Sequence, residues 1–315
     1  MLSKKFEYFI VGTICCLAIE LTLWVCHYPL NKEKTENLPG TKITNPKLGW
    51  IHRPGTYAFL GPKDNKPFRV TYLEDGSRIT QAKRNFSNRS TFLLGCSYVE
   101  GFGLGDKDTL GWKLQAKLPQ INVINLGTGG YGTLQSFLRL KDYMKQTGNR
   151  PEIIIYGFAD FHIFRNIKNP LSNRYVKEPG IYPYCDGTSC KVWTGKRTLF
   201  LGRFSRVVSL LENLVDNIKV MRQKENAKKI TLRLIQDMQQ TAKEIDAHFI
   251  AVNIEEDHDK WAERFKENNI PFVDCYRHDF SAKEYRLADN HPNSRMSEEL
   301  ANCIAETIQK LPPAK

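Results

Sequence analysis

A serine in a small-residue turn is the feature of this sequence best suited to chemistry. Residues 90–105 read STFLLGCSYVEGFGLG, in which a short apolar run ends at Gly95 and is followed by Cys96 and Ser97. A buried strand that ends in such a turn is how α/β enzymes hold a nucleophile at the carboxyl edge of a sheet. A serine there can attack an acyl carbon once a neighbouring base removes its proton.

Two later segments carry the partners that a serine nucleophile needs. Residues 125–130 (NLGTGG) form a glycine-rich turn, and residues 289–293 (DNHPN) place an aspartate and a histidine just before the last predicted helix. His291 is the natural base for Ser97, and Asp289 can orient the imidazole and stabilise its charged form. Each segment alone also allows a structural reading, as a turn or a helix cap. Both together, in this chain order, favour an acyl-transfer site.

These segments resemble the sequence blocks of the SGNH (GDSL-like) hydrolase superfamily, over about residues 90–311. That family has Gly-Asp-Ser before a glycine-rich stretch, an Asn followed by a glycine turn, Gly-x-Asn-Asp, and an Asp and a His before a terminal helix. The resemblance implies Ser97 as nucleophile, His291 as base and Asp289 as its partner. It also implies that the backbone N–H groups of Ser97 and Gly130 form an oxyanion hole, which stabilises the charge that develops on the substrate oxygen.

The chain departs from the family pattern at three places. Cys96 stands where the family has an aspartate, and only one of Cys96 and Ser97 can face His291, because adjacent strand residues point in opposite directions. Serine fits the resemblance better than cysteine. The acid and the base are separated by one residue, where the family motif has two. Ala159 replaces the family's oxyanion asparagine, so we expect a weaker hole or one completed by another group. The candidates for that group are Asp160, His162 and Asn166, with ordinary structural roles as the alternative for the first two.

Strands and helices alternate around these segments, which predicts an α/β fold. Strand, helix and strand in this order build a central parallel sheet covered on both faces, a three-layer sandwich like that of SGNH hydrolases. Ligands bind at the carboxyl ends of such strands. Residues 165–205, rich in Pro, Gly and Asn, are interpreted as a long insertion that shapes specificity. The predicted strands are 92–94, 122–125, 153–156, 248–253 and 271–274, and the predicted helices are 133–145, 207–246, 261–268 and 296–311.

A mainly apolar run, residues 8–26, follows Lys4 and Lys5 and is long enough to span a bilayer as a helix, with Glu20 as its one charge. No A-x-A-like cleavage site follows it, so the sequence predicts one uncleaved signal anchor. The positive charges at its two ends differ little, and we expect the catalytic body outside the cytoplasm. The predicted units are the anchor, residues 1–28; a linker and strand-rich preface, residues 29–88; and an SGNH-hydrolase-like domain, residues 89–315.

Composition and cysteine usage limit the partners. The net charge of +12 is accompanied by no recognisable nucleic-acid module, so solvated helix faces or an anionic envelope account for it, and no nucleic-acid partner is expected. Cys185 and Cys190 flank a polar DGTS loop, which predicts a disulfide if the compartment is oxidising. No further Cys or His lies nearby at ligand spacing, so we expect neither a metal nor another cofactor.

Three functions are compatible with these residues. The first is a membrane-anchored serine esterase or deacylase that removes O-acyl groups from an envelope polysaccharide, glycan or lipid through an acyl-enzyme. The second is an acyl transferase, such as an acetyltransferase, which uses the same chemistry with a glycan acceptor in place of water. The third is a non-catalytic envelope protein that keeps the fold. A separation of Ser97 from His291 beyond hydrogen-bond reach would favour the third.

Overall fold

A parallel sheet of five strands forms the centre of the computed structural model, which describes residues 4–30, 38–61, 66–82, 89–169, 181–194, 202 and 204–312. The strand order is β11-β10-β7-β5-β6, and all four neighbouring pairs are parallel. Every residue of β5, β6 and β7 is buried, as expected for parallel strands covered on both faces. The strands are β5 (Ser90–Leu94), β6 (Asn122–Asn125), β7 (Ile153–Phe158), β10 (His248–Asn253) and β11 (Phe272–Asp274).

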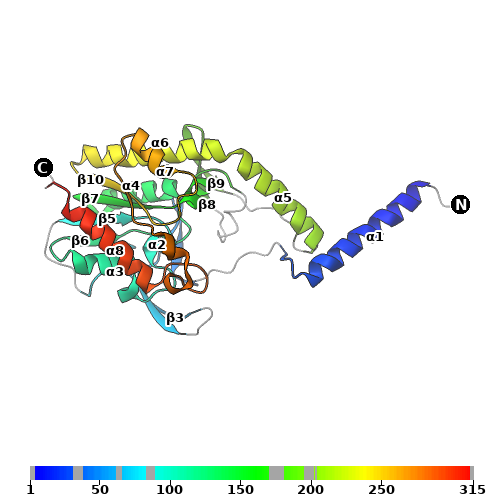
Figure 1. Cartoon of the computed structure of the whole chain (residues 1–315), viewed down its shortest axis with the longest axis horizontal. Helices are drawn as coiled ribbons and strands as arrows, with labels where there is room; N and C mark the ends of the chain where they lie inside the picture. The colour runs from blue at the N-terminus through cyan, green and yellow to red at the C-terminus, as the bar shows by residue number, and fades with distance from the viewer. Residues whose placement is uncertain are drawn as a thin grey trace.

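Helices cover both faces of this sheet (Figure 1). Phe92 and Ile154 point to one face and pack against α4 (Thr133–Thr147), α6 (Lys224–Glu244) and α7 (Trp261–Glu267). Their neighbours Leu93 and Ile155 point to the other face, where α3 (Leu110–Lys117) and α8 (Ser294–Gln309) pack. This alternation along each strand fills two cores, and the predicted three-layer α/β fold is confirmed.

The predicted helical region 207–246 consists of two helices, α5 (Arg206–Arg222) and α6, which meet at Gln223. A one-turn helix, α2 (Ser97–Glu100), follows β5 directly. Short 3₁₀ helices cover Asp106–Asp108, Asp160–Arg165, His278–Ser281 and Lys283–Tyr285.

The segment before the sheet is rich in strands, as the sequence predicts. It contains two antiparallel pairs: β1 (Lys42–Asn45) with β2 (Gly49–His52), and β3 (Gly55–Leu60) with β4 (Pro67–Tyr72). The segment is fastened to the main body by a small apolar cluster of four buried side chains, Leu48, Trp50, Tyr131 and Tyr182.

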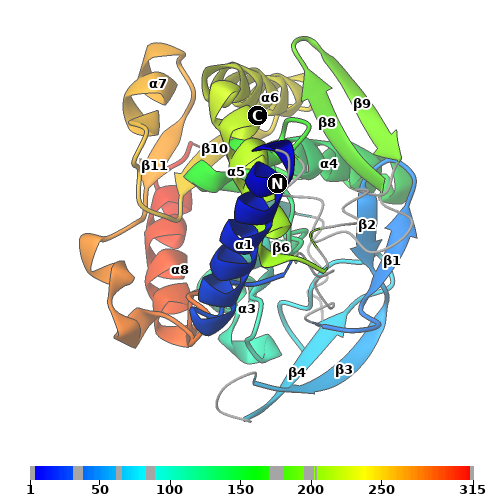
Figure 2. The same ribbon diagram turned by 90° about the vertical axis from the view of Figure 1, so that its right-hand side faces the viewer.

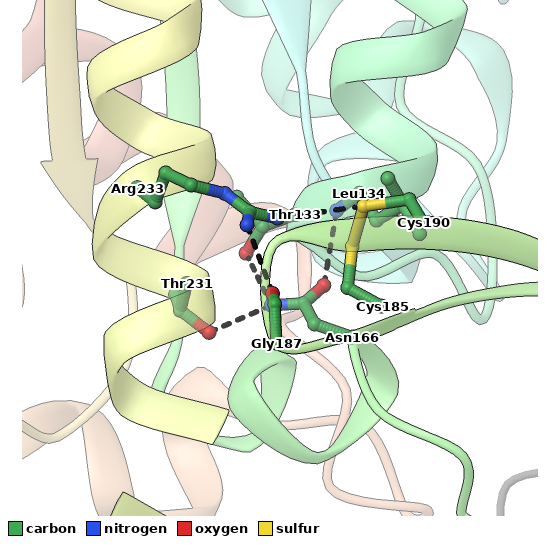
Figure 3. The surroundings of a disulfide bond; sticks show 8 residues. All are labelled: Thr133, Leu134, Asn166, Cys185, Gly187, Cys190, Thr231 and Arg233. Atoms are coloured by element: carbon green, nitrogen blue, oxygen red, sulfur yellow. Dashed lines mark hydrogen bonds between the residues drawn. A yellow bond between two sulfur atoms is a disulfide. The ribbon is translucent and has the colours of Figure 1, made fainter. Parts of the chain in front are cut away.

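The insertion 165–205 contains an antiparallel hairpin, β8 (Ile181–Asp186) and β9 (Ser189–Thr194), while 170–180 and 195–201 lie outside the described residues. A disulfide joins Cys185 to Cys190 across this hairpin (Figure 3). A second disulfide, Cys275–Cys303, links the segment after β11 to α8 across 28 positions of sequence. No motif or local spacing pairs these two cysteines.

One long helix stands apart from the body in Figure 1 and lies in front of the body in the turned view of Figure 2. This helix, α1 (Lys4–Val25), has a mean hydropathy of 2.0 over its most apolar 18 residues, and none of that window is buried in the protein. Among the described residues, α1 is the one helix long and apolar enough to cross a membrane. It covers the run that the sequence predicts as an anchor.

Candidate active site

Ser97 is the first residue of α2 and follows the turn at Gly95 and Cys96 in which β5 ends. The turn requires glycine at Gly95, because φ there is +153° and a Cβ would lie 2.5 Å from the Val99 Cγ2 atom. Ser97 is partly exposed, whereas the neighbouring Cys96 has 0% exposure and burial raises the pKa of its thiol. Of the two candidate nucleophiles in this turn, Ser97 is therefore the accessible one, since a buried thiol with a raised pKa is unreactive.

Three predicted catalytic side chains meet at this edge of the sheet. The Ser97 Oγ atom lies 3.1 Å from His291 Nε2, although the two residues are 194 positions apart. On the other side of the ring, His291 Nδ1 lies 3.1 Å from Asp289 Oδ2. That contact is close but is not an aligned hydrogen bond, because Nδ1 has no partner with hydrogen-bond geometry among the described residues. The interaction with His291 lowers the pKa of Asp289, so this carboxyl stays ionised.

A tight turn presents His291 to the serine. The backbone N–H of Leu287 donates to the His291 carbonyl over 2.7 Å, and Asn290 adopts the left-handed conformation, with φ of +68°. Asparagine is one of the few residues other than glycine that tolerate this conformation. The imidazole contacts the rings of Tyr98 and Phe102, with ring centroids 5.5 and 4.6 Å away. These aromatic contacts fix the plane in which the base can act.

Arg286 connects this turn to the rest of the sheet edge. Its guanidinium donates to the Tyr98 hydroxyl and to the Asn290 carbonyl, each over 3.2 Å, and pairs with Glu255 over 3.0 Å. Burial and the Glu255 carboxylate raise the pKa of Tyr98, so its hydroxyl stays protonated. None of these supporting residues carries a motif, so the sequence alone did not reveal them.

The glycine-rich turn after β6 passes directly beside Ser97. A Cβ built on Gly129 would lie 3.8 Å from the Ser97 Cβ and only 2.8 Å from an Oε2 oxygen of the buried Glu100. Gly130 has φ of +87°, which favours glycine. Neither the Ser97 N–H nor the Gly130 N–H donates to another described residue, so both are available as oxyanion donors, and their use remains a prediction.

A tryptophan from the strand-rich preface holds this turn in place. The Trp50 Nε1–H donates to the Gly129 carbonyl over 3.0 Å, and the Lys42 ammonium lies 3.4 Å from the same oxygen. In a planar trans peptide the carbonyl and the following N–H point in opposite directions. Fixing the Gly129 oxygen therefore fixes the direction of the Gly130 N–H as well.

We expect Trp50→Phe to lower kcat for p-nitrophenyl acetate about tenfold with little change in KM, because the ring remains but the donor to Gly129 is lost. Steady-state kinetics measure both constants. Trp112→Phe, in α3, is the matched control and should leave kcat unchanged. An unaltered kcat in Trp50→Phe would show that this hydrogen bond does not position the turn.

Asn166 does not serve as a replacement oxyanion donor, and this prediction is wrong. Its amide is buried and donates to the hydroxyls of Thr133 and Thr231, over 3.1 and 2.7 Å. Its Oδ1 accepts the Leu134 N–H over 2.9 Å, at the first turn of α4 (Figure 3). The side chain thus ties α4 to α6, and no donor is left for a substrate.

His162 also turns into the core. It has 0% exposure, its Nδ1 lies 2.8 Å from the Tyr156 hydroxyl, and its ring packs against Phe158 and Phe161. Burial lowers the pKa of His162 well below its ordinary value, so the ring is neutral. A side chain enclosed by these rings is structural, which was the alternative the sequence left open.

Asp160 is bound to a different segment of the chain. Its Oδ2 accepts the backbone N–H of His258 over 3.0 Å. Burial, together with the carboxylates of Asp257 and Asp259, raises the pKa of Asp160 to about 6. Asn166 and Asp160 are therefore engaged with other residues, and His162 is enclosed in the core, so none of the three is exposed as a replacement for the family asparagine at position 159.

The raised pKa of Asp160 gives a pH-dependent stability. The folded state binds this proton more tightly than the unfolded state, so stability falls as pH rises from the ordinary aspartate pKa to about 6. Asp160→Asn keeps an oxygen for the His258 N–H and removes the charge. We expect it to raise Tm above pH 6 and to have no effect at pH 3.5, measured by thermal unfolding. An equal Tm change at both pH values would contradict this cause.

The protein is an α/β protein of three layers. Ser97, His291 and Asp289 lie together at the carboxyl edge of its parallel sheet. No protein-family model matches the chain, and no curated protein matches it. Solved structures do match. The psychrotrophic esterase EstA from Pseudoalteromonas sp. is 12% identical, with 70% of this chain and 100% of that chain covered and a TM-score of 0.43.

Two further solved structures are similar to the chain. A member of the lipolytic protein G-D-S-L family from Veillonella parvula is 13% identical, with 71% of this chain and 100% of that chain covered and a TM-score of 0.42. AlinE4, an SGNH-hydrolase family esterase, is 14% identical, with 73% and 100% covered and a TM-score of 0.39. These are hydrolases of the kind that the sequence blocks resemble.

Proposed function

We propose that the protein is a membrane-anchored serine esterase or deacylase of the SGNH type. Ser97 is the nucleophile, His291 is the base, and Asp289 orients the imidazole and stabilises its charged form. The observation that carries the proposal is the 3.1 Å separation of Ser97 Oγ from His291 Nε2, with a carboxylate 3.1 Å from the other ring nitrogen. A base within hydrogen-bond reach of a partly exposed serine is the first requirement for acyl transfer.

The chemistry follows from these positions. His291 Nε2 takes the hydroxyl proton as Ser97 Oγ bonds to the ester carbonyl carbon, and the negative charge on the carbonyl oxygen is stabilised by the Ser97 and Gly130 N–H groups. The bond to the leaving alcohol then breaks, and His291 donates its proton to that alcohol. Water attacks the acyl-enzyme with the same base and releases the acid and the free serine. Asp289 stabilises the imidazolium in both halves.

The proposed substrates are O-acyl groups on an envelope polysaccharide, glycan or lipid. Support comes from α1, which has the length and composition of a membrane span, and from two disulfides in the body. Disulfides persist in oxidising compartments, so we place the body outside the cytoplasm. A tethered enzyme there meets acylated envelope components.

Labelling with a fluorophosphonate tests the nucleophile. Purified full-length protein in detergent should be labelled at Ser97 and should cleave p-nitrophenyl acetate, whereas Ser97→Ala should do neither. Cys96→Ala is the matched control one residue away. This variant should still be labelled at Ser97, because the Cys96 thiol is buried and is not expected to react with the probe. A folded wild-type protein that is neither labelled nor active would overturn the proposal in favour of a non-catalytic role.

A further inference from the structure

The helix α5 carries most of its large apolar side chains on the outside. It extends from the body toward α1 (Figure 1), and its buried residues are Ser209, Asp216 and Val220, of which two are polar. This is the reverse of a helix packed on a protein core, where the apolar face is covered and the polar face is solvated. Six large apolar side chains of α5 are exposed, and we call them the apolar stripe: Leu210, Leu211, Leu214, Val215, Ile218 and Met221.

The opposite side of α5 is polar and faces the end of α1. Ser209 donates to the Pro29 carbonyl over 3.0 Å, and Asn213 donates to the Tyr28 hydroxyl over 3.0 Å. Positions 205, 209, 213 and 216 recur at intervals of three and four residues, so they share one face of the helix. The apolar stripe lies on the other face, with about half of the Leu211, Leu214 and Met221 side chains exposed.

The first turn of α5 is bound by Glu20, the one charge in the apolar run. The Glu20 carboxylate accepts the backbone N–H groups of Arg206 and Val207 over 2.7 and 3.0 Å, and the Ser205 hydroxyl over 2.8 Å. An ionisable residue in a membrane span needs a partner, and the free N–H groups of a helix start suit a carboxylate. Glu20 thus has its partner in α5.

This contact sets the depth of α5 if α1 spans a bilayer. Glu20 lies five residues before the end of α1 at Val25, which is about 7 Å along the helix axis. Amphipathic interfacial helices place their apolar faces ~5–10 Å into the boundary between headgroups and acyl chains. Lys219 and Arg222, exposed at the far end of α5, can meet anionic headgroups.

We propose that α5 is an interfacial helix whose apolar stripe contacts the lipid acyl chains of the bilayer that α1 enters. This inference rests on the anchoring part of the proposed function and not on the esterase chemistry. The occupant is lipid because the stripe and the membrane-length helix α1 both expose apolar side chains, and because the start of α5 is hydrogen-bonded to Glu20 within α1. The body is then held to the surface by two elements in place of one tether.

Depth-dependent fluorescence quenching tests this on the full chain. Cys15, Cys16 and Cys26 are replaced by alanine, and one new cysteine is labelled with NBD in vesicles of phosphatidylcholine and phosphatidylglycerol that contain a doxyl-labelled acyl chain. Leu214→Cys reports the apolar stripe, Leu17→Cys reports α1, and Lys266→Cys on the exposed side of α7 is the control. We expect the doxyl lipid to reduce emission more than about twofold at 214 and 17 and to leave 266 unchanged.

The outcomes separate the two proposals. Quenching at 17 but not at 214 overturns the lipid contact of α5 and leaves the anchor intact. Absence of quenching at both positions overturns the anchor and the inference with it. A label at 214 that is blue-shifted, unquenched by lipid and cross-linkable between copies would assign the stripe to a second copy of the chain. Ester hydrolysis is not part of the readout, so it stands or falls separately.

Discussion

Replacing Ser97 with alanine is expected to lower kcat for p-nitrophenyl acetate at least about 10³-fold. Among the described residues, Ser97 carries the one hydroxyl that hydrogen-bonds to the His291 ring, over 3.1 Å. His291→Ala should cause a loss of the same order, because no other base contacts the serine among the residues that the structure describes. The double variant should lose no more than either single variant, since the two residues act as one unit. Steady-state kinetics give all three values.

A second serine variant and a check of folding serve as controls for the loss of activity. Ser294→Ala removes a hydroxyl at the start of α8 that bonds Asp108, and it should keep nearly full activity. Circular dichroism and Tm should match those of the wild type for every variant. A Ser97→Ala protein that retains more than about a tenth of the activity would show that hydrolysis occurs elsewhere.

Loss of the Cys275–Cys303 disulfide is expected to cost about 3–4 kcal/mol of the free energy of unfolding, because the bond closes a long segment of sequence in the unfolded chain. That segment contains the His291 turn and the start of α8, so activity should be lost at lower temperature as well. Cys275→Ala/Cys303→Ala can be compared with the wild type by urea unfolding. Tm and the temperature at which activity is lost should fall together.

The hairpin disulfide provides the matched control for this experiment. Cys185 and Cys190 are five positions apart, and a short closed loop removes less entropy from the unfolded chain. Cys185→Ala/Cys190→Ala should therefore destabilise the protein less. Equal losses in both double variants would contradict the loop-length explanation.

The sheet and the central pair of the site were open to prediction, because both depend on local patterns. Continuous apolar runs such as residues 153–156 mark strands buried on two faces, and parallel strands bring their carboxyl ends to one edge. Ser97 and His291 each follow a recognisable local pattern, so their meeting could be expected. The predicted helix 133–145 and the structural helix α4 differ by two residues at one end.

The supporting contacts could not be predicted, because they join segments that carry no motif. Arg286 and Glu255 are 31 positions apart and share only a charge pair. Asn166 was misassigned since a side-chain amide near the third block could face either the substrate or the core, and only the packing of α4 and α6 decides between them. Sequence spacing carries no information about that choice.

The hydrogen bond from Trp50 to the Gly129 carbonyl implies that the strand-rich preface belongs to the smallest fragment expected to be active. The residues that hold the glycine turn lie outside the sheet-forming part of the chain and begin at Lys42. The shortest piece that can carry out the chemistry is therefore longer than the shortest piece that contains the sheet and the three catalytic candidates. Any truncation, graft or chimaera that begins at residue 89 would keep the proposed nucleophile and base but would lose the contacts that orient the proposed oxyanion donor, Gly130.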